Sequence, residues 1–221
     1  MTLLLHLTTM ADAPAQPAWL DADEQARLAE ISDPARAAQF VAGHCLAREL
    51  AAQLGGGSAS QWRFVVAADG RRRLAHAQHA PLYASISHSR TALAVAVGRV
   101  PLGVDVETPG PPRDWLALAR TMFSPDEVRV LADTAEPARP AQFLATWTLK
   151  EAWAKRSGLG LQRQSARRCT ARACDAPEAE AWTWALPEGG TLALAASVGA
   201  RVVVAGATDE ARPWRYLEST D

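Results

Sequence analysis

The strongest constraint on the fold is a helix whose two ends are both marked in the sequence. Asp33 is a good N-cap residue, Pro34 suits the first helical position, and Gly55 can end the helix. The run Gly-Gly-Gly-Ser at 55–58 predicts a flexible connection, and a strand-like pattern begins at Trp62. A long helix that leads into strands is typical of mixed α+β domains.

The same order of elements recurs further along the chain. Ser124-Pro-Asp-Glu127 has the pattern of a capping box, and a longer helix is predicted from Pro140 to just before Gly158. We also expect a helix at 115–122 and strands at 62–67, 91–97, 103–107, 182–186, 192–198 and 202–204. The prediction is an α+β fold in two successive halves.

Charge and cysteine content exclude several classes of protein. The 221 residues carry a formal net charge of −1, so a general nucleic-acid binder is not expected. Three cysteines cannot form a dense disulfide framework, and the N-terminus lacks the basic region of a signal peptide. No apolar run approaches the ~20 residues that span a bilayer. We expect a cytoplasmic protein that binds neither nucleic acid nor membrane.

Two carboxylates share one face of the strand predicted at 103–107. Asp105 and Glu107 are two residues apart, so both side chains point the same way out of an otherwise apolar run. At about 4 Å and an effective dielectric near 20, their repulsion would cost on the order of 4 kcal/mol. A hard cation such as Mg²⁺ or Mn²⁺ would remove this cost. The alternative is a strand end with one solvated face.

A second candidate motif is Trp147-Thr-Leu-Lys-Glu-Ala-Trp-Ala-Lys155, on the helix predicted from Pro140. Glu151 and Lys155 are four residues apart and therefore lie one turn apart on one helix face. They are either part of a functional site or an exposed ion pair worth about 0.3–0.5 kcal/mol.

A third candidate motif is Ser85-Ile-Ser-His-Ser89, which follows a short candidate strand. Such a segment can present a hydroxyl, an imidazole and backbone N–H groups to a phosphate. The alternative is ordinary loop polarity. No Gly-x-x-x-x-Gly-Lys loop for a nucleotide is present in the sequence.

Taken in order, these three motifs resemble those of the Sfp-type (surfactin synthetase activating) phosphopantetheinyl transferases. The resemblance runs from 85–89 through 103–107 to 147–155 and the following Gly158-Leu-Gly-Leu161. Each motif is weak alone, and their order and spacing make the resemblance specific. It covers roughly residues 82 to 161.

The resemblance implies a pseudo-dimer of two similar α/β halves with the active site in the cleft between them. We place these halves at residues 1–101 and 102–221. The resemblance further implies that Asp105, Glu107 and Glu151 ligate Mg²⁺.

The resemblance also implies catalytic and coenzyme A-binding roles. The expected catalytic residues are Glu151 as candidate base, Lys155 beside the reacting phosphate, and Glu107. The expected coenzyme A contacts are Arg36, Arg71, Arg72, Ser87, His88, Lys150 and Lys155. Arg71 stands where relatives often have lysine, and Arg36 is the basic candidate for the 3′-phosphate. The sequence departs from the family pattern at His44, Gln39 and Ser85.

The implied reaction moves the 4′-phosphopantetheine arm of coenzyme A to a serine of an acyl or peptidyl carrier protein, with release of 3′,5′-ADP. Two alternatives are a non-catalytic module that binds coenzyme A or a carrier protein, and a metal-dependent phosphodiesterase. An internal pseudo-dimer needs no second subunit, so a monomer is expected.

Overall fold

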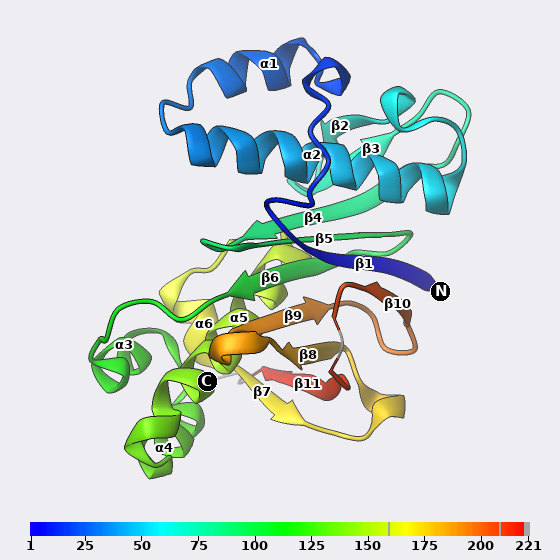
Figure 1. Ribbon diagram of the computed structural model, residues 1–221. Helices are drawn as coiled ribbons and strands as arrows, with labels where there is room; N and C mark the ends of the chain where they lie inside the picture. Colours follow the sequence, from blue (N-terminus) through cyan, green and yellow to red (C-terminus); the bar gives the residue numbers. More distant parts are fainter. Residues whose placement is uncertain (159, 208, 219–221) are drawn as a thin grey trace.

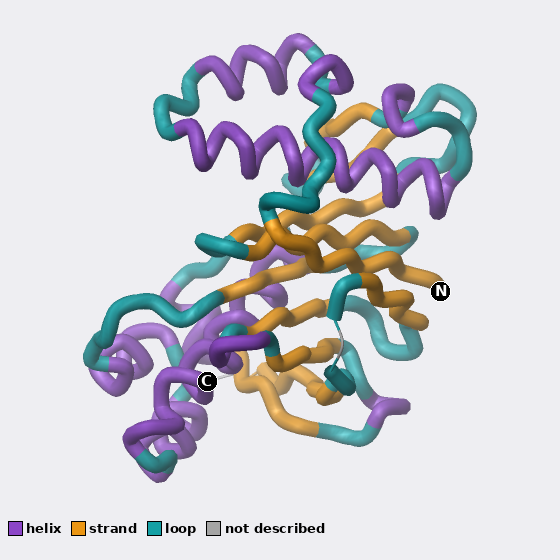
Figure 2. The backbone as a smooth tube through the Cα atoms, viewed as in Figure 1, coloured by secondary structure: helices purple, strands orange, loops and turns teal. Residues whose placement is uncertain are grey.

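The computed structural model describes residues 1–158, 160–207 and 209–218, which form two sheets with helices packed on them (Figures 1 and 2). The first sheet has the strand order β10 (Arg201–Ala205), β1 (Thr2–Thr9), β5 (Ala92–Gly98), β4 (Leu82–His88), β3 (Arg72–Ala75) and β2 (Arg63–Val66). The second has the order β6 (Gly103–Glu107), β9 (Thr191–Ala195), β8 (Ala181–Ala185), β11 (Arg212–Glu218) and β7 (Cys169–Ala173). The α-helices are α1 (Ala22–Ala29), α2 (Pro34–Gly55), α3 (Trp115–Met122), α4 (Pro125–Asp133), α5 (Arg139–Ser157) and α6 (Arg163–Arg168). The predicted α+β class is confirmed.

The ends of the two long helices follow their cap residues. Asp33 caps α2 by accepting a backbone N–H of the first turn at 2.9 Å. Gly56, with φ of +93°, ends α2 one residue later than predicted. Helix α5 has Pro140 in its first turn and ends at Gly158, whose φ of +77° is the left-handed conformation that glycine adopts without strain.

The structure adds four strands, β1, β3, β7 and β11, to those expected from the sequence. Strand β1 lies between β5 and β10, and its residues Leu3, Leu4 and Leu5 are buried. The segment 85–88 was expected to follow a short strand, and it is instead the end of β4, paired with β5. Whether such a segment forms a strand depends on the neighbouring strand with which it pairs. That neighbour can be distant in the sequence, so local patterns do not predict the pairing.

The two sheets share part of their strand arrangement. The series β1-β5-β4-β3-β2 and β6-β9-β8-β11-β7 both have antiparallel neighbours throughout. They differ in connectivity, because β3 precedes β4 in the chain whereas β11 follows β9. In both, a long helix separates the first strand from a central hairpin. Strand β10, from late in the chain, extends the first sheet by pairing in parallel with β1. The division at 101/102 and the pseudo-dimer arrangement remain predictions.

A buried ion cluster fixes α1 on α2. Glu24 accepts hydrogen bonds from the Asp21 N–H at 2.8 Å, His44 Nδ1 at 2.5 Å and Arg48 Nη2 at 2.5 Å. Burial raises the pKa of Glu24, but the hydrogen bonds from His44 and Arg48 outweigh it and lower this pKa to about 2. The stability that Glu24 contributes is therefore complete above its ordinary pKa of 4.5 and is lost as the pH falls toward 2. His44, one of the departures from the family pattern, has this internal role.

A common core joins the two sheets at β6, an edge strand of the second sheet (Figure 1). Leu5 of β1 and Ala96 of β5 belong to the same buried cluster as Val104 and Val106 of β6. These four side chains are at most 1% exposed. The carboxylates of β6 therefore project from a strand that is held by both sheets.

Candidate active site

Asp105 is a buried carboxylate whose two oxygens have different surroundings. Its Oδ1 accepts hydrogen bonds from Ser87 Oγ at 2.8 Å and Lys155 Nζ at 2.7 Å. Its Oδ2 is buried and has no hydrogen-bond partner among the residues that the structure describes. An unpartnered buried carboxylate oxygen is costly, so this atom marks a position where a missing partner would bind.

Two further carboxylates belong to the same electrostatic environment. Burial raises the pKa of Glu107, and the charge of Asp105 raises it further, while a hydrogen bond from Trp147 and the charge of Lys155 oppose the shift. Burial also raises the pKa of Glu151, again followed by the charge of Asp105. The structure thus brings the three acidic residues predicted from the sequence into mutual influence.

Lys155 reaches across from α5 to β6. Its Nζ donates to Asp105 Oδ1 and to the carbonyl oxygen of Val104, the latter at 3.1 Å. In the described part of the chain no ion pair joins Lys155 to Glu151, so the exposed-pair interpretation of this motif does not hold. Gly103 permits the close packing, because a Cβ there would lie 2.1 Å from the carbonyl oxygen of Ala152 in α5.

The three carboxylates offer the kind of ligand atoms that a hard divalent cation prefers. Asp105, Glu107 and Glu151 supply only oxygen atoms, and Asp105 Oδ2 lacks a partner. Over the described ranges, no group of three or more His, Cys, Asp or Glu side chains is already gathered closely enough to hold a metal ion. Lys155 partly neutralises Asp105 in this geometry.

The residues expected at the nucleotide end lie on α2, at the end of β4, on β3 and in the turn before β3. Burial lowers the pKa of His88, and the positive charges of Arg36 and Lys155 lower it further, so these three side chains influence one another. Ser87, by contrast, is buried, with 7% of its surface exposed, and its hydroxyl donates a hydrogen bond to Asp105. A cavity of about 340 Å³ is lined by Arg71, Arg72 and Lys155, together with Phe64, Gly70, Ala84, Ser85, Ile86 and Gly158.

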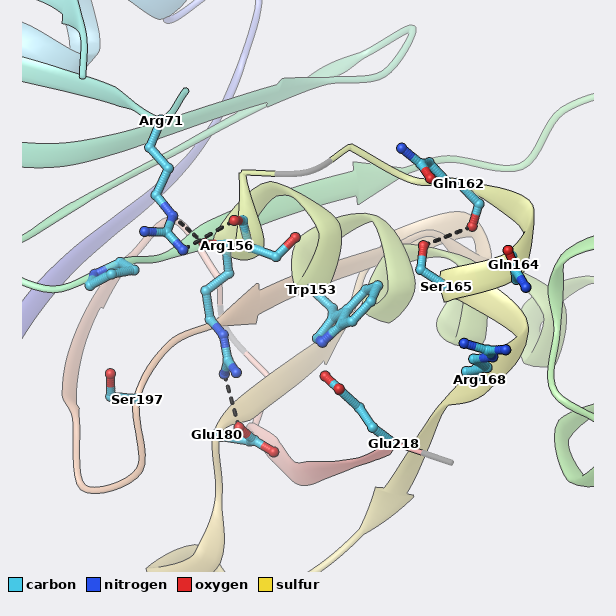
Figure 3. Close-up of a pocket in the computed structure, with 12 residues that line it drawn as sticks. Arg71, Trp153, Arg156, Gln162, Gln164, Ser165, Arg168, Glu180, Ser197 and Glu218 are labelled. Carbon is cyan, nitrogen blue, oxygen red and sulfur yellow. Dashed lines mark hydrogen bonds and ion pairs between the residues drawn. The ribbon is translucent and has the colours of Figure 1, made fainter. Parts of the chain in front are cut away.

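Arg71 joins the first half of the chain to the end of α5. Its Nε donates to the carbonyl oxygen of Arg156 at 2.9 Å, and its Nη2 donates to that of Ser157 at 3.0 Å. Its Nη1 donates to Asp69 at 3.0 Å. Figure 3 shows the Arg71 side chain directed at this end of α5, next to a cavity of about 780 Å³. A guanidinium at a helix C-terminus satisfies free carbonyl groups and favours the helix dipole.

We expect both Arg71→Ala and Arg71→Lys to lower the free energy of unfolding by about 1 kcal/mol, because an ammonium cannot reproduce the two-carbonyl contact. Urea unfolding of both variants would measure this. Arg73→Lys is the matched control, since Arg73 donates to the same Asp69 carboxylate. If Arg71→Lys is as stable as wild type and only Arg71→Ala loses coenzyme A affinity, Arg71 is a simple charge contact.

Lys150 is fully buried, contrary to the prediction that it binds coenzyme A. Its side chain is 0% exposed and forms an ion pair with Glu127 Oε2 at 2.7 Å. Its Nζ also donates to the carbonyl oxygens of Ala166 and Cys169. Lys150 therefore fastens α5 to α4, α6 and β7, and we remove it from the candidate site.

Comparisons with known proteins all indicate the same superfamily. The sequence model of the 4′-phosphopantetheinyl transferase superfamily matches residues 101–188. The 4′-phosphopantetheinyl transferase HetI of Nostoc sp. is 28% identical over 148 residues, 66% of this chain and 62% of that protein. The 4′-phosphopantetheinyl transferase psf-1 of Bacillus pumilus is 35% identical over 77 residues, 35% of this chain and 32% of that protein. Residues 101–188 form a segment of the 4′-phosphopantetheinyl transferase superfamily type.

The superfamily match contains the carboxylate and lysine part of the candidate site. Asp105, Glu107, Glu151 and Lys155 all lie within residues 101–188. The expected coenzyme A contacts from the first half lie outside that range. Leu159, part of the motif that resembles this superfamily, is outside the described residues. The aligned segment spans about three fifths of the Nostoc transferase, 62% of its length.

Two residues near this candidate site were not predicted from the sequence. Trp147 lowers the pKa of Glu107, and it lies one turn before Glu151 on α5, so helical spacing could have indicated it. Burial lowers the pKa of Arg72, and the positive charge of Arg27 in α1 lowers it further. No local signal links Arg27 to Arg72, because α1 and β3 are far apart in the chain.

Among the described residues no helix has the length and apolar character needed to cross a membrane.

Proposed function

We propose that this chain transfers 4′-phosphopantetheine from coenzyme A to a serine of an acyl or peptidyl carrier protein in a Mg²⁺-dependent reaction that releases 3′,5′-ADP. The observation that carries the proposal is the Asp105 carboxylate, with Lys155 on one oxygen and no partner on the other. Glu107 and Glu151 lie within its electrostatic influence. A cation site and an ammonium group together would stabilise the negative charge that develops as the pyrophosphate linkage of coenzyme A is cleaved.

Asp105, Glu107 and Glu151 are the residues that would hold Mg²⁺ or Mn²⁺. When bound, the ion would offset negative charge on the pyrophosphate of coenzyme A. Burial first, and then the charge of Asp105, raises the pKa of both Glu107 and Glu151, so a bound cation would favour the charged forms of these carboxylates.

The proposed step is a substitution at the β-phosphorus of coenzyme A. The serine oxygen forms a bond to this phosphorus, and the bond to the bridging oxygen breaks, so that 3′,5′-ADP leaves with the electron pair. Glu151 accepts the serine proton, directly or through water, and burial raises its pKa in the direction that favours proton uptake. Lys155 stabilises the charge that develops on the phosphate oxygens.

Two cavities offer room for the two substrates. The cavity of about 340 Å³ beside Arg71, Arg72 and Lys155 suits the anionic coenzyme A. A second cavity, of about 330 Å³, reaches Glu107 and is lined mainly by α3 and α5, including Met122 and Trp147. Its apolar side chains suit the approach of a carrier protein surface.

The deciding experiment incubates the purified chain with coenzyme A, Mg²⁺ and a panel of apo carrier proteins, and measures carrier mass and 3′,5′-ADP together. Transfer adds one phosphopantetheine arm to a carrier and releases one equivalent of 3′,5′-ADP. EDTA should abolish both signals.

The other outcomes separate the alternatives. Release of 3′,5′-ADP with unchanged carrier mass identifies a phosphodiesterase. Coenzyme A or carrier binding without either product identifies a non-catalytic module. Turnover that survives extensive chelation contradicts the metal requirement. The cytoplasmic location and the monomeric state remain proposals that rest on the sequence.

A further inference from the structure

Two serine hydroxyls of β4 join the two sheets. Ser85 Oγ accepts the Val104 N–H at 3.0 Å, and Ser87 Oγ accepts the Val106 N–H at 3.3 Å. Because β6 is an edge strand, these N–H groups point away from its partner β9 and need acceptors. Both serines are buried, at 9% and 7% exposed. They accept N–H groups of β6 in the same way, two residues apart along the strand.

Ser87 differs from Ser85 in one contact. Its hydroxyl also donates to Asp105 Oδ1 at 2.8 Å, the oxygen that accepts from Lys155. The Val106 N–H occupies an acceptor position of Ser87 Oγ, and an ionised carboxylate can only accept, so the hydroxyl proton is directed at Asp105. The two donors on Oδ1 fix the rotation of the carboxylate and leave Oδ2 without a partner.

We propose that Ser87 is a positioning residue that orients the Asp105 carboxylate, so that Oδ2 is presented to a divalent cation. This inference rests on the metal-binding part of the proposed function. It replaces the expectation that the Ser87 side chain contacts coenzyme A, because that hydroxyl is already engaged with β6. Groups that orient a metal ligand through a hydrogen bond commonly change metal affinity by about 10–100-fold when removed.

The test compares Ser87→Ala with Ser85→Ala as a matched control. Each substitution removes one buried hydroxyl and leaves one N–H of β6 without its acceptor, so we expect similar losses of thermal stability. Only Ser87→Ala also removes a donor to Asp105. Free Mn²⁺, measured by electron paramagnetic resonance during titration of the protein without coenzyme A or carrier, reports metal affinity independently of turnover.

We expect Ser87→Ala to weaken Mn²⁺ binding by about 10-fold or more and Ser85→Ala to leave it near wild type. Ser87→Thr, which keeps the hydroxyl, should restore most of the affinity. Equal weakening in both alanine variants would overturn the proposal, as would no Mn²⁺ binding by wild type. Unchanged Mn²⁺ affinity in Ser87→Ala, with a raised KM for coenzyme A, would make Ser87 a substrate contact instead.

The Mn²⁺-binding test of Ser87 and the test of the transfer reaction can fail independently of each other. Wild-type protein that binds Mn²⁺ in a Ser87-dependent way without modifying any carrier supports the positioning role and refutes the transfer reaction. Transfer activity with equal Mn²⁺ affinity in all variants supports the reaction and refutes the positioning role.

Discussion

Replacing Glu151 with glutamine is expected to reduce phosphopantetheine transfer by about 10² or more, the usual effect of removing a general base. The substitution keeps the shape of the side chain and removes both its charge and its basicity. Coenzyme A binding, measured by calorimetry with Mg²⁺ present, should weaken far less than kcat falls. Stability should change little, because Glu151 forms no ion pair within the described part of the chain.

Glu49→Gln is a suitable control for this variant. Glu49 is an exposed residue of α2, and its substitution makes the same change in charge away from the candidate site. Lys155→Ala should also slow transfer, and its effect should not add to that of Glu151→Gln if both act on one transition state. Near-wild-type turnover of Glu151→Gln would overturn the proposed mechanism.

Replacing Asp105 with asparagine is expected to give opposite results for activity and stability. The loss of a carboxylate ligand should weaken Mn²⁺ binding and reduce turnover by more than about 100-fold, beyond the effect of disturbing a residue that only orients a ligand. The metal-free protein should be as stable as wild type or more stable, because repulsion with Glu107 and Glu151 is relieved. Thermal unfolding with and without metal measures both effects.

Asp105→Asn also weakens the ion pair with Lys155, and this loss offsets part of the stabilisation expected for the metal-free protein. Lys155 is 31% exposed, so its pairing with Asp105 contributes no more than about 1 kcal/mol. A folded Asp105→Asn variant with wild-type Mn²⁺ affinity would show that Asp105 is not a ligand. A variant that unfolds in the absence of metal would show instead that the Asp105 charge has a structural role.

Helix ends and the shared faces of neighbouring side chains could be predicted because they depend on local geometry. Asp33 and Pro34 start α2 at the expected position, and the two carboxylates of β6 lie on the expected strand. The family-like spacing of three motifs then indicated that β6 and α5 belong to one site. The hydrogen bond between Lys155 of α5 and Asp105 of β6 supports that proposal.

The sequence by itself determined the helical periodicity of α5, and with it that Glu151 and Lys155 share a face. Lys150 and Lys155, five residues apart, then project roughly 140° apart around the helix. Only the tertiary structure decided that Lys155 faces β6 and that Lys150 is buried on Glu127. It also directed Arg71 to the end of α5 and Ser87 to Asp105. The physical reason is that these partners come from distant segments, and their meeting depends on how the two sheets pack.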